Sequence, residues 1–200
     1  MYAYTDEDGE FAVHTARSVV EGYMENRRVP NIEFPEKFEE KSGVFTTIST
    51  YPERNLRGCI GYPEPIFPLK EALIRSALAA AFEDPRFPPL SEHEIGRVVF
   101  EVSLLTPPKK VQVAKRKDLL GVIKIGVHGL IAERGMFRGL LLPQVPVEWK
   151  WNVKEFLEQT CWKAGLPKNC WKDESVQFYT FTAEIFEEEA PGGTVRRKEL

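Results

Sequence analysis

The segment LRGCIG places an arginine and a cysteine two positions apart, at Arg57 and Cys59. Side chains of an extended strand alternate between its two faces, so we expect these residues to share one face with Asn55 and Gly61. A guanidinium beside a thiol favours the thiolate and lowers the pKa of the cysteine. Cys59 is therefore a candidate nucleophile, redox thiol or ligand contact, with Arg57 as its charge partner.

Each residue of this segment also has a purely structural interpretation. Cysteine is often buried, and Cys59 fits a small hydrophobic side chain in a packed, glycine-rich strand. Arg57 equally fits an ion pair that supports the fold. Gly58 and Gly61 predict positions where a ligand or another backbone comes close. The pattern alone leaves these alternatives open.

A general base for Cys59 requires a histidine within hydrogen-bond reach. Of the three histidines, His128 is the candidate, because the segment IGVHGL sets it between two glycines on an expected strand. The alternative is a histidine at a strand end that hydrogen-bonds to the backbone.

Two further pairs are candidates for ligand contacts. Glu101 and Ser103 share one face of an apolar strand, where they line either a cleft or a solvated outer face. In the segment DPRF, Asp84 and Arg86 form either a local turn held by an ion pair or, through Arg86, a bidentate site for a carboxylate or phosphate.

The chain has one clear basic cluster, composed of Lys109, Lys110, Lys115, Arg116 and Lys117. These residues are candidates for phosphate contacts, and a solvated loop is the alternative. The spacing of Cys161 and Cys170 permits a disulfide if the two ends meet, with two reduced, buried thiols as the alternative.

Composition limits the classes of protein to consider. The chain has 200 residues, 42% of them hydrophobic, which suits one domain with a substantial core. A net charge of -3 argues against a dedicated nucleic-acid binder. No stretch approaches a membrane span and the acidic start is unlike a signal peptide, so we expect a cytoplasmic protein. No phosphate-binding loop, dinucleotide fingerprint or zinc-ligand spacing is present, so the sequence predicts no cofactor and no metal.

The pattern of helical and strand periodicity predicts an α+β fold with an antiparallel or mixed sheet flanked by helices. The expected helices are residues 5–26, 69–82 and 151–164, the second rich in alanine and the third capped by Asn152. The expected strands are residues 43–51, 56–61, 97–106, 126–133, 136–142 and 175–186.

Several ordered segments carry a family resemblance: LRGCIG, FEDPRFPPL, FEVSLLTPP, GVHGL, LLPQV and KAGL. In this order they resemble the AMMECR family over nearly the whole chain. The resemblance implies one two-lobed α+β domain over residues 1–190 with a cleft between unequal lobes, and a frayed tail over residues 191–200. It also implies a functional LRGCIG segment. Microbial relatives are associated with a Memo-like protein and a radical S-adenosylmethionine protein, which we expect as partners.

Two hypotheses for the function follow. In the first, the chain is an enzyme or enzyme component that uses Cys59, with Arg57, on a small or modified substrate in the cleft. In the second, it is a non-catalytic binding or adaptor module whose LRGCIG segment lines a recognition groove.

Overall fold

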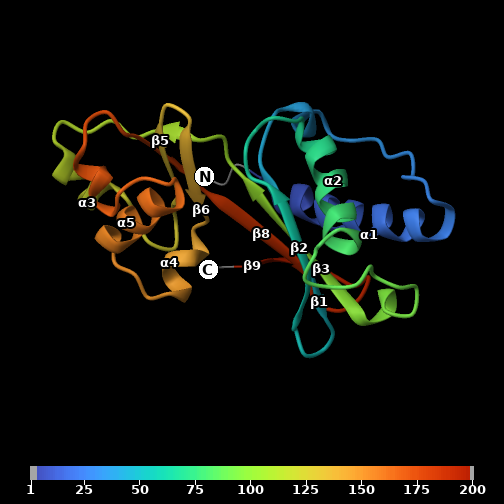
Figure 1. The fold of residues 1–200 in the computed structure, drawn as a ribbon. Helices are drawn as coiled ribbons and strands as arrows, with labels where there is room; N and C mark the ends of the chain where they lie inside the picture. Colours follow the sequence, from blue (N-terminus) through green and yellow to red (C-terminus); the bar gives the residue numbers. More distant parts are fainter. Residues whose placement is uncertain (1–3, 199–200) are drawn as a thin grey trace. The chain divides into compact units, whose positions relative to one another are not determined.

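The computed structural model describes residues 4–198, which form the two antiparallel sheets and covering helices of an α+β fold (Figure 1). The predicted fold class is confirmed. The chain divides into two compact units, the first made of Met1–Leu105 and Glu184–Glu199, the second mainly of Thr106–Ala183. The cleft that the family resemblance implies stays a prediction.

Unit 1 contains a five-stranded sheet in the order β2-β1-β3-β8-β9. Its strands are β1 (Val44–Thr50), β2 (Leu56–Tyr62), β3 (Val98–Leu105), β8 (Ala183–Glu188) and β9 (Val195–Lys198). Its helices are α1 (Asp6–Asn26), α2 (Leu69–Phe82) and the short turns η1 (Glu36–Glu39) and η2 (Ile95–Arg97). β2 and β9 are therefore the edge strands of this sheet.

Helices α1 and α2 pack against each other and against the strands of this sheet (Figure 1). Thr5 caps α1, because its side chain accepts from the Asp8 N–H and the Asp8 side chain accepts from the Thr5 N–H in return. The apolar stripe of α1 and the alanine face of α2 then bury a core with Ile48 and Phe100.

Unit 2 contains a four-stranded sheet in the order β4-β7-β5-β6. Its strands are β4 (Lys109–Lys110), β5 (Gly129–Arg134), β6 (Phe137–Leu141) and β7 (Gln177–Phe181). Its helices and helical turns are η3 (Arg116–Asp118), α3 (Leu119–Val122), α4 (Gln144–Glu148), α5 (Val153–Lys163) and η4 (Lys168–Lys172). Helix α5 packs on β5 and β6, and a disulfide between Cys161 and Cys170 joins it to η4.

Two expectations for the end of the chain are wrong. The strand expected over residues 175–186 is two strands, β7 and β8, which belong to different sheets. Between them the Thr182 carbonyl accepts from the Thr106 N–H and the Thr182 N–H donates to the Thr106 hydroxyl, so the backbone of Thr182 bonds outside both sheets. The tail expected to fray over residues 191–200 contains β9, which is antiparallel to β8, while its last two residues lie outside the described part.

Candidate functional site

Cys59 lies on edge strand β2, in a row of side chains that crosses the sheet of unit 1. It stands opposite Thr47 of β1, and Thr47 stands opposite Glu101 of β3. The Thr47 hydroxyl donates to the Cys59 Sγ at 3.3 Å. The row therefore gives the half-buried thiol a hydrogen-bond donor on its own sheet face.

The outer backbone edge of β2 is occupied at Cys59 by the turn after α2. The Cys59 N–H donates to Asp84 Oδ2 at 2.9 Å, and Arg86 Nη2 donates to the Cys59 carbonyl at 3.2 Å. An edge strand leaves such groups unpaired unless another element covers them. The turn formed by residues 84–86 thus hydrogen-bonds both the N–H and the carbonyl of Cys59.

The ion pair predicted between Asp84 and Arg86 is confirmed. Arg86 Nη2 lies 2.7 Å from Asp84 Oδ2, and Arg86 Nε donates to the other carboxylate oxygen at 2.9 Å. The hydrogen bonds from Arg86, followed by those from the two backbone amides, hold the pKa of Asp84 well below its usual range. This carboxylate is therefore ionised at neutral pH and keeps the turn in place.

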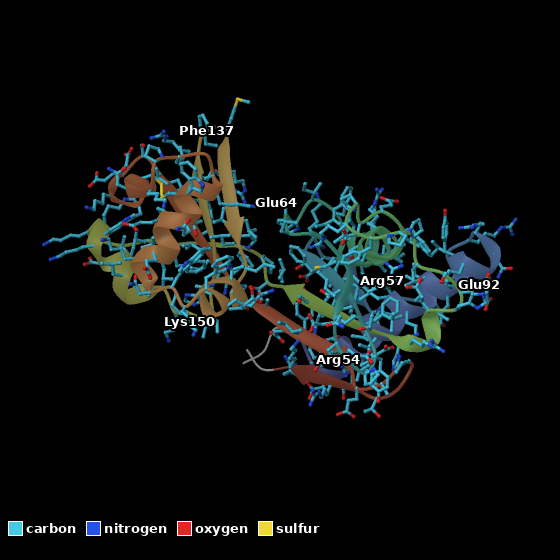
Figure 2. All side chains as sticks on the ribbon, turned by 60° about the horizontal axis from the view of Figure 1, so that its bottom comes forward. Arg54, Arg57, Glu64, Glu92, Phe137 and Lys150 are labelled. Atoms are coloured by element: carbon cyan, nitrogen blue, oxygen red, sulfur yellow. A yellow bond between two sulfur atoms is a disulfide. The ribbon has the colours of Figure 1, made fainter. Side chains whose placement is uncertain are left out.

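Arg57 does not partner the thiol, which corrects the sequence prediction. Its guanidinium donates to both carboxylate oxygens of Glu94, at 2.7 and 3.1 Å (Arg57 is labelled in Figure 2). This hydrogen-bonded pair lowers the pKa of Glu94 to about 2. The cause of the error is a β-bulge, because Ile48 pairs with Gly58 and Ser49 with Leu56, leaving Arg57 as the extra residue. A bulge redirects a side chain and breaks the two-residue alternation.

The pKa of Cys59 is raised, not lowered as the sequence analysis expects. Burial raises it most, against the hydrogen bond from Thr47 and the charge of Arg86, which both lower it. The charges of Glu101 and Asp84 raise it further. The thiol is therefore protonated at neutral pH, and the cation that acts on it is Arg86.

The two glycines of LRGCIG make room for protein groups. A Cβ at Gly58 would lie 2.1 Å from the carbonyl oxygen of Ala80 in α2, so a neighbouring backbone comes close there, as expected. A Cβ at Gly61 would lie 2.1 Å from the ring of Phe45. Protein atoms therefore fill the space beside both glycines. Direct ligand contacts by Gly58 and Gly61 stay predictions.

Replacing Gly58 with alanine is expected to lower the free energy of unfolding by about 1–3 kcal/mol. The added methyl group meets backbone, which cannot rotate away as a side chain can. Urea unfolding followed by far-UV circular dichroism measures the loss. Gly96→Ala is the matched control, because a Cβ at Gly96 has no atom within 4 Å. Equal losses in both variants would contradict the close approach of α2.

The remaining candidates near this sheet are spread along it. Glu101 accepts a hydrogen bond from Lys198 Nζ of β9 at 2.7 Å, so it is part of an ion pair. Ser103 lies two residues after Glu101 on the same face of β3, and it stands opposite Phe45 of β1. Asn55 precedes β2 and closes the turn, where its N–H donates to the Thr50 hydroxyl at 3.2 Å.

His128 belongs to unit 2 and lies in the turn before β5. Its Nδ1 accepts from the backbone N–H of Lys124 at 3.2 Å, which is the backbone-bonded alternative of the sequence analysis. Burial, and then the positive charge of Lys124, lower its pKa. Its role as a general base for Cys59 stays a prediction.

Thr47, Glu94 and Lys198 are the contacts that sequence reasoning missed. Thr47 could have been found from the pairing of two neighbouring strands, but its register depends on the bulge at Arg57. Glu94 lies 37 positions from Arg57 and also accepts from the Ser91 N–H at 2.9 Å, so nothing in the sequence marks it as the partner of Arg57. Within residues 4–198 no group of three metal-ligating side chains occurs. No helix of that part is long and apolar enough to span a membrane.

The model of the AMMECR1 family matches residues 13–186 of this chain. The chain belongs to the AMMECR1 family. A similar protein of this family from Methanocaldococcus jannaschii is 52% identical over 200 residues and is covered in full, as is this chain. Another, from Aquifex aeolicus, is 51% identical over 94% of this chain and 96% of its own.

A solved AMMECR1-family structure has the same fold. The crystal structure of protein PH0010 from Pyrococcus horikoshii matches with a TM-score of 0.84 and 50% sequence identity, covering 100% of both chains. The names of these AMMECR1 relatives state no activity. The comparisons therefore establish the family and the fold of this chain.

Proposed function

We propose that this AMMECR1 protein is a binding module, and that Cys59 contacts its ligand as a neutral thiol without forming a covalent bond. The observation that carries the proposal is that the Arg57 guanidinium donates to Glu94 and not to the half-buried thiol of Cys59. Burial accordingly raises the pKa of Cys59. A nucleophilic cysteine needs a thiolate, which cationic surroundings normally provide. Here the arginine of the LRGCIG segment is paired with Glu94.

Arg86 is the group best placed to attract a ligand to this surface. Its side chain is 53% exposed, while that of its partner Asp84 is 1% exposed. Its Nε and Nη2 are engaged by Asp84 and the Cys59 carbonyl. Its Nη1 has no hydrogen-bond partner among residues 4–198, so it is the donor that an incoming carbonyl or anionic group meets beside the thiol.

The enzyme hypothesis remains as the second candidate, with one change. The charge of Arg86 lowers the pKa of Cys59, although less than burial raises it. Arg86 therefore replaces Arg57 as the residue that would stabilise a thiolate. The family resemblance adds Memo-like and radical S-adenosylmethionine proteins as proposed partners under either hypothesis.

The pH dependence of alkylation separates the two candidates. Cys59 is the free cysteine of the chain, because Cys161 and Cys170 form a disulfide, so iodoacetamide reports on one sulfur. We expect the rate to reach half its maximum above pH 9.0, the ordinary value for a thiol. Below that pH, reaction is expected to be slower than for a free thiol, because the thiolate fraction is smaller.

Two variants sharpen the measurement. Removing the cation with Arg86→Gln is expected to move the profile to still higher pH, whereas the distant Lys70→Gln leaves it unchanged. Cys59→Ser is expected to abolish labelling. A rate that is already at its plateau at neutral pH would refute the neutral thiol and favour the enzyme hypothesis.

A further inference from the structure

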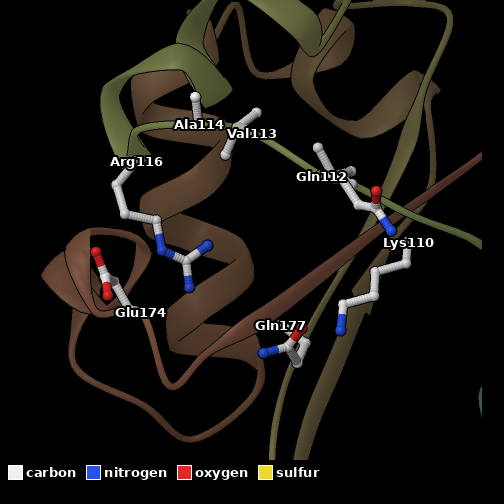
Figure 3. Close-up of a pocket in the computed structure, with 8 residues that line it drawn as sticks. Lys110, Gln112, Val113, Ala114, Arg116, Glu174 and Gln177 are labelled. Carbon is white, nitrogen blue, oxygen red and sulfur yellow. The ribbon is translucent and has the colours of Figure 1, made fainter.

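Unit 2 contains a pocket of about 350 Å³ that lies apart from the Cys59 strand in the sequence (Figure 3). The volume falls within the range of small-molecule sites. The pocket is lined by Lys110, Val111, Gln112, Val113, Ala114, Arg116, Glu174 and Gln177. The basic cluster of the sequence analysis thus contributes two of its five members to a concave surface.

The two walls of the pocket are joined by hydrogen bonds to backbone carbonyls. One wall runs from the end of β4 to Arg116, and the other runs from Glu174 into the start of β7. The N–H of Val111 donates to the carbonyl of Phe178 at 2.8 Å. Arg116 Nη2 donates to the carbonyls of Asp173 and Val176 and so ties the walls together at one end. The pocket is therefore a formed feature of this unit.

The pocket carries an excess of positive charge. Lys110 and Arg116 extend into it from different sides in Figure 3. Neither side chain has a carboxylate partner among residues 4–198: the Arg116 guanidinium donates to backbone carbonyls, and the Lys110 ammonium forms no ion pair. Within the lining, Lys110 and Arg116 stand against Glu174 as the one acidic residue.

The uncharged polar groups of the lining suit hydroxyls. Gln112 and Gln177 each offer an amide donor and an amide acceptor, and the carboxylate of Glu174 accepts from a hydroxyl. An arginine and a lysine on separate sides match a dianion better than a single negative charge, since each forms charge-assisted hydrogen bonds. We propose that this pocket binds a small phosphate monoester that carries hydroxyl groups, with the phosphate held between Lys110 and Arg116.

Glycerol phosphate is the probe that tests the proposal. Titration of the whole chain, followed by calorimetry and by NMR shifts of backbone amides, is expected to show saturable binding. The largest amide shifts are expected at residues 110–116 and 174–177, and glycerol without phosphate is expected not to bind. Lys110→Gln is expected to weaken binding about tenfold or more, because a charged hydrogen bond is lost. Lys110 is exposed on a short edge strand, so this variant keeps the fold.

Lys117→Gln is the matched control, because Lys117 belongs to the same cluster but does not line the pocket. We expect it to leave the affinity unchanged within a factor of about two, as a distant surface charge does in salt. Equal binding of glycerol and glycerol phosphate would overturn the proposal. A single-stranded RNA provides the second contradicting outcome. If it bound more tightly than glycerol phosphate and lost as much affinity with Lys117→Gln as with Lys110→Gln, the basic cluster would be an open polyanion-binding surface and the proposal would be wrong.

Discussion

Replacing Glu188 with glutamine is expected to lower the free energy of unfolding by about 3–5 kcal/mol. The Glu188 side chain is 0% exposed and forms an ion pair with Arg17, which is 8% exposed. Arg17 Nη2 also lies 2.6 Å from Glu188 Oε2, and that oxygen accepts from the Phe100 N–H at 3.0 Å. The glutamine would leave the arginine charge without its main partner in the interior.

Urea unfolding followed by far-UV circular dichroism measures this loss. Glu189→Gln is the control, because the neighbouring residue is exposed and is expected to change the stability by less than about 0.5 kcal/mol. The double variant Arg17→Met with Glu188→Leu is expected to recover much of the loss, since apolar pairs often replace buried ion pairs without cost. A loss below about 1 kcal/mol in Glu188→Gln would contradict the buried pair.

Removing the disulfide with Cys161→Ser and Cys170→Ser together is expected to cost roughly 2–3 kcal/mol of stability, as closure of a short loop predicts. The two cysteines are nine positions apart and are 0% and 4% exposed, so the variant also places two hydroxyls in the core of unit 2. Tryptophan fluorescence is a suitable readout because all four tryptophans, Trp149, Trp151, Trp162 and Trp171, lie in that unit.

A reducing agent provides the second arm of this experiment. The wild-type chain under reduction is expected to lose stability in the same direction as the double variant, and Cys59→Ser is expected to respond to reduction as the wild type does. If reduction and the double substitution both left the fluorescence transition in place, the disulfide would not contribute to stability.

The local elements could be predicted from the sequence because their causes are local. The N-cap at Asn152 depends on a residue three positions away, Glu155. The strand pair around residues 44–62 follows from two close β-forming segments. The ion pair of Asp84 with Arg86 spans a single turn.

The features that sequence reasoning missed depend on register and on distant residues. One extra residue at Arg57 redirects its side chain, and no composition rule marks that position. The pairing of Arg17 with Glu188 spans 171 positions, so neither residue signals the other. The pKa of Cys59 depends on burial, which follows from packing and not from the flanking letters. The residue types of the site could therefore be predicted from the sequence, whereas the contacts between them could not.

Unit 1 is assembled from two stretches of chain that flank unit 2, and β3 and β8 are neighbours in its sheet. During translation the ribosome therefore releases all of Thr106–Ala183 before the strands β8 and β9 emerge. Until then the nascent N-terminal part has three of its five strands, and Arg17 has no Glu188 to neutralise it. Unit 2 is therefore the first unit whose whole stretch of chain is available for folding. Unit 1 is completed only after β8 and β9 have emerged.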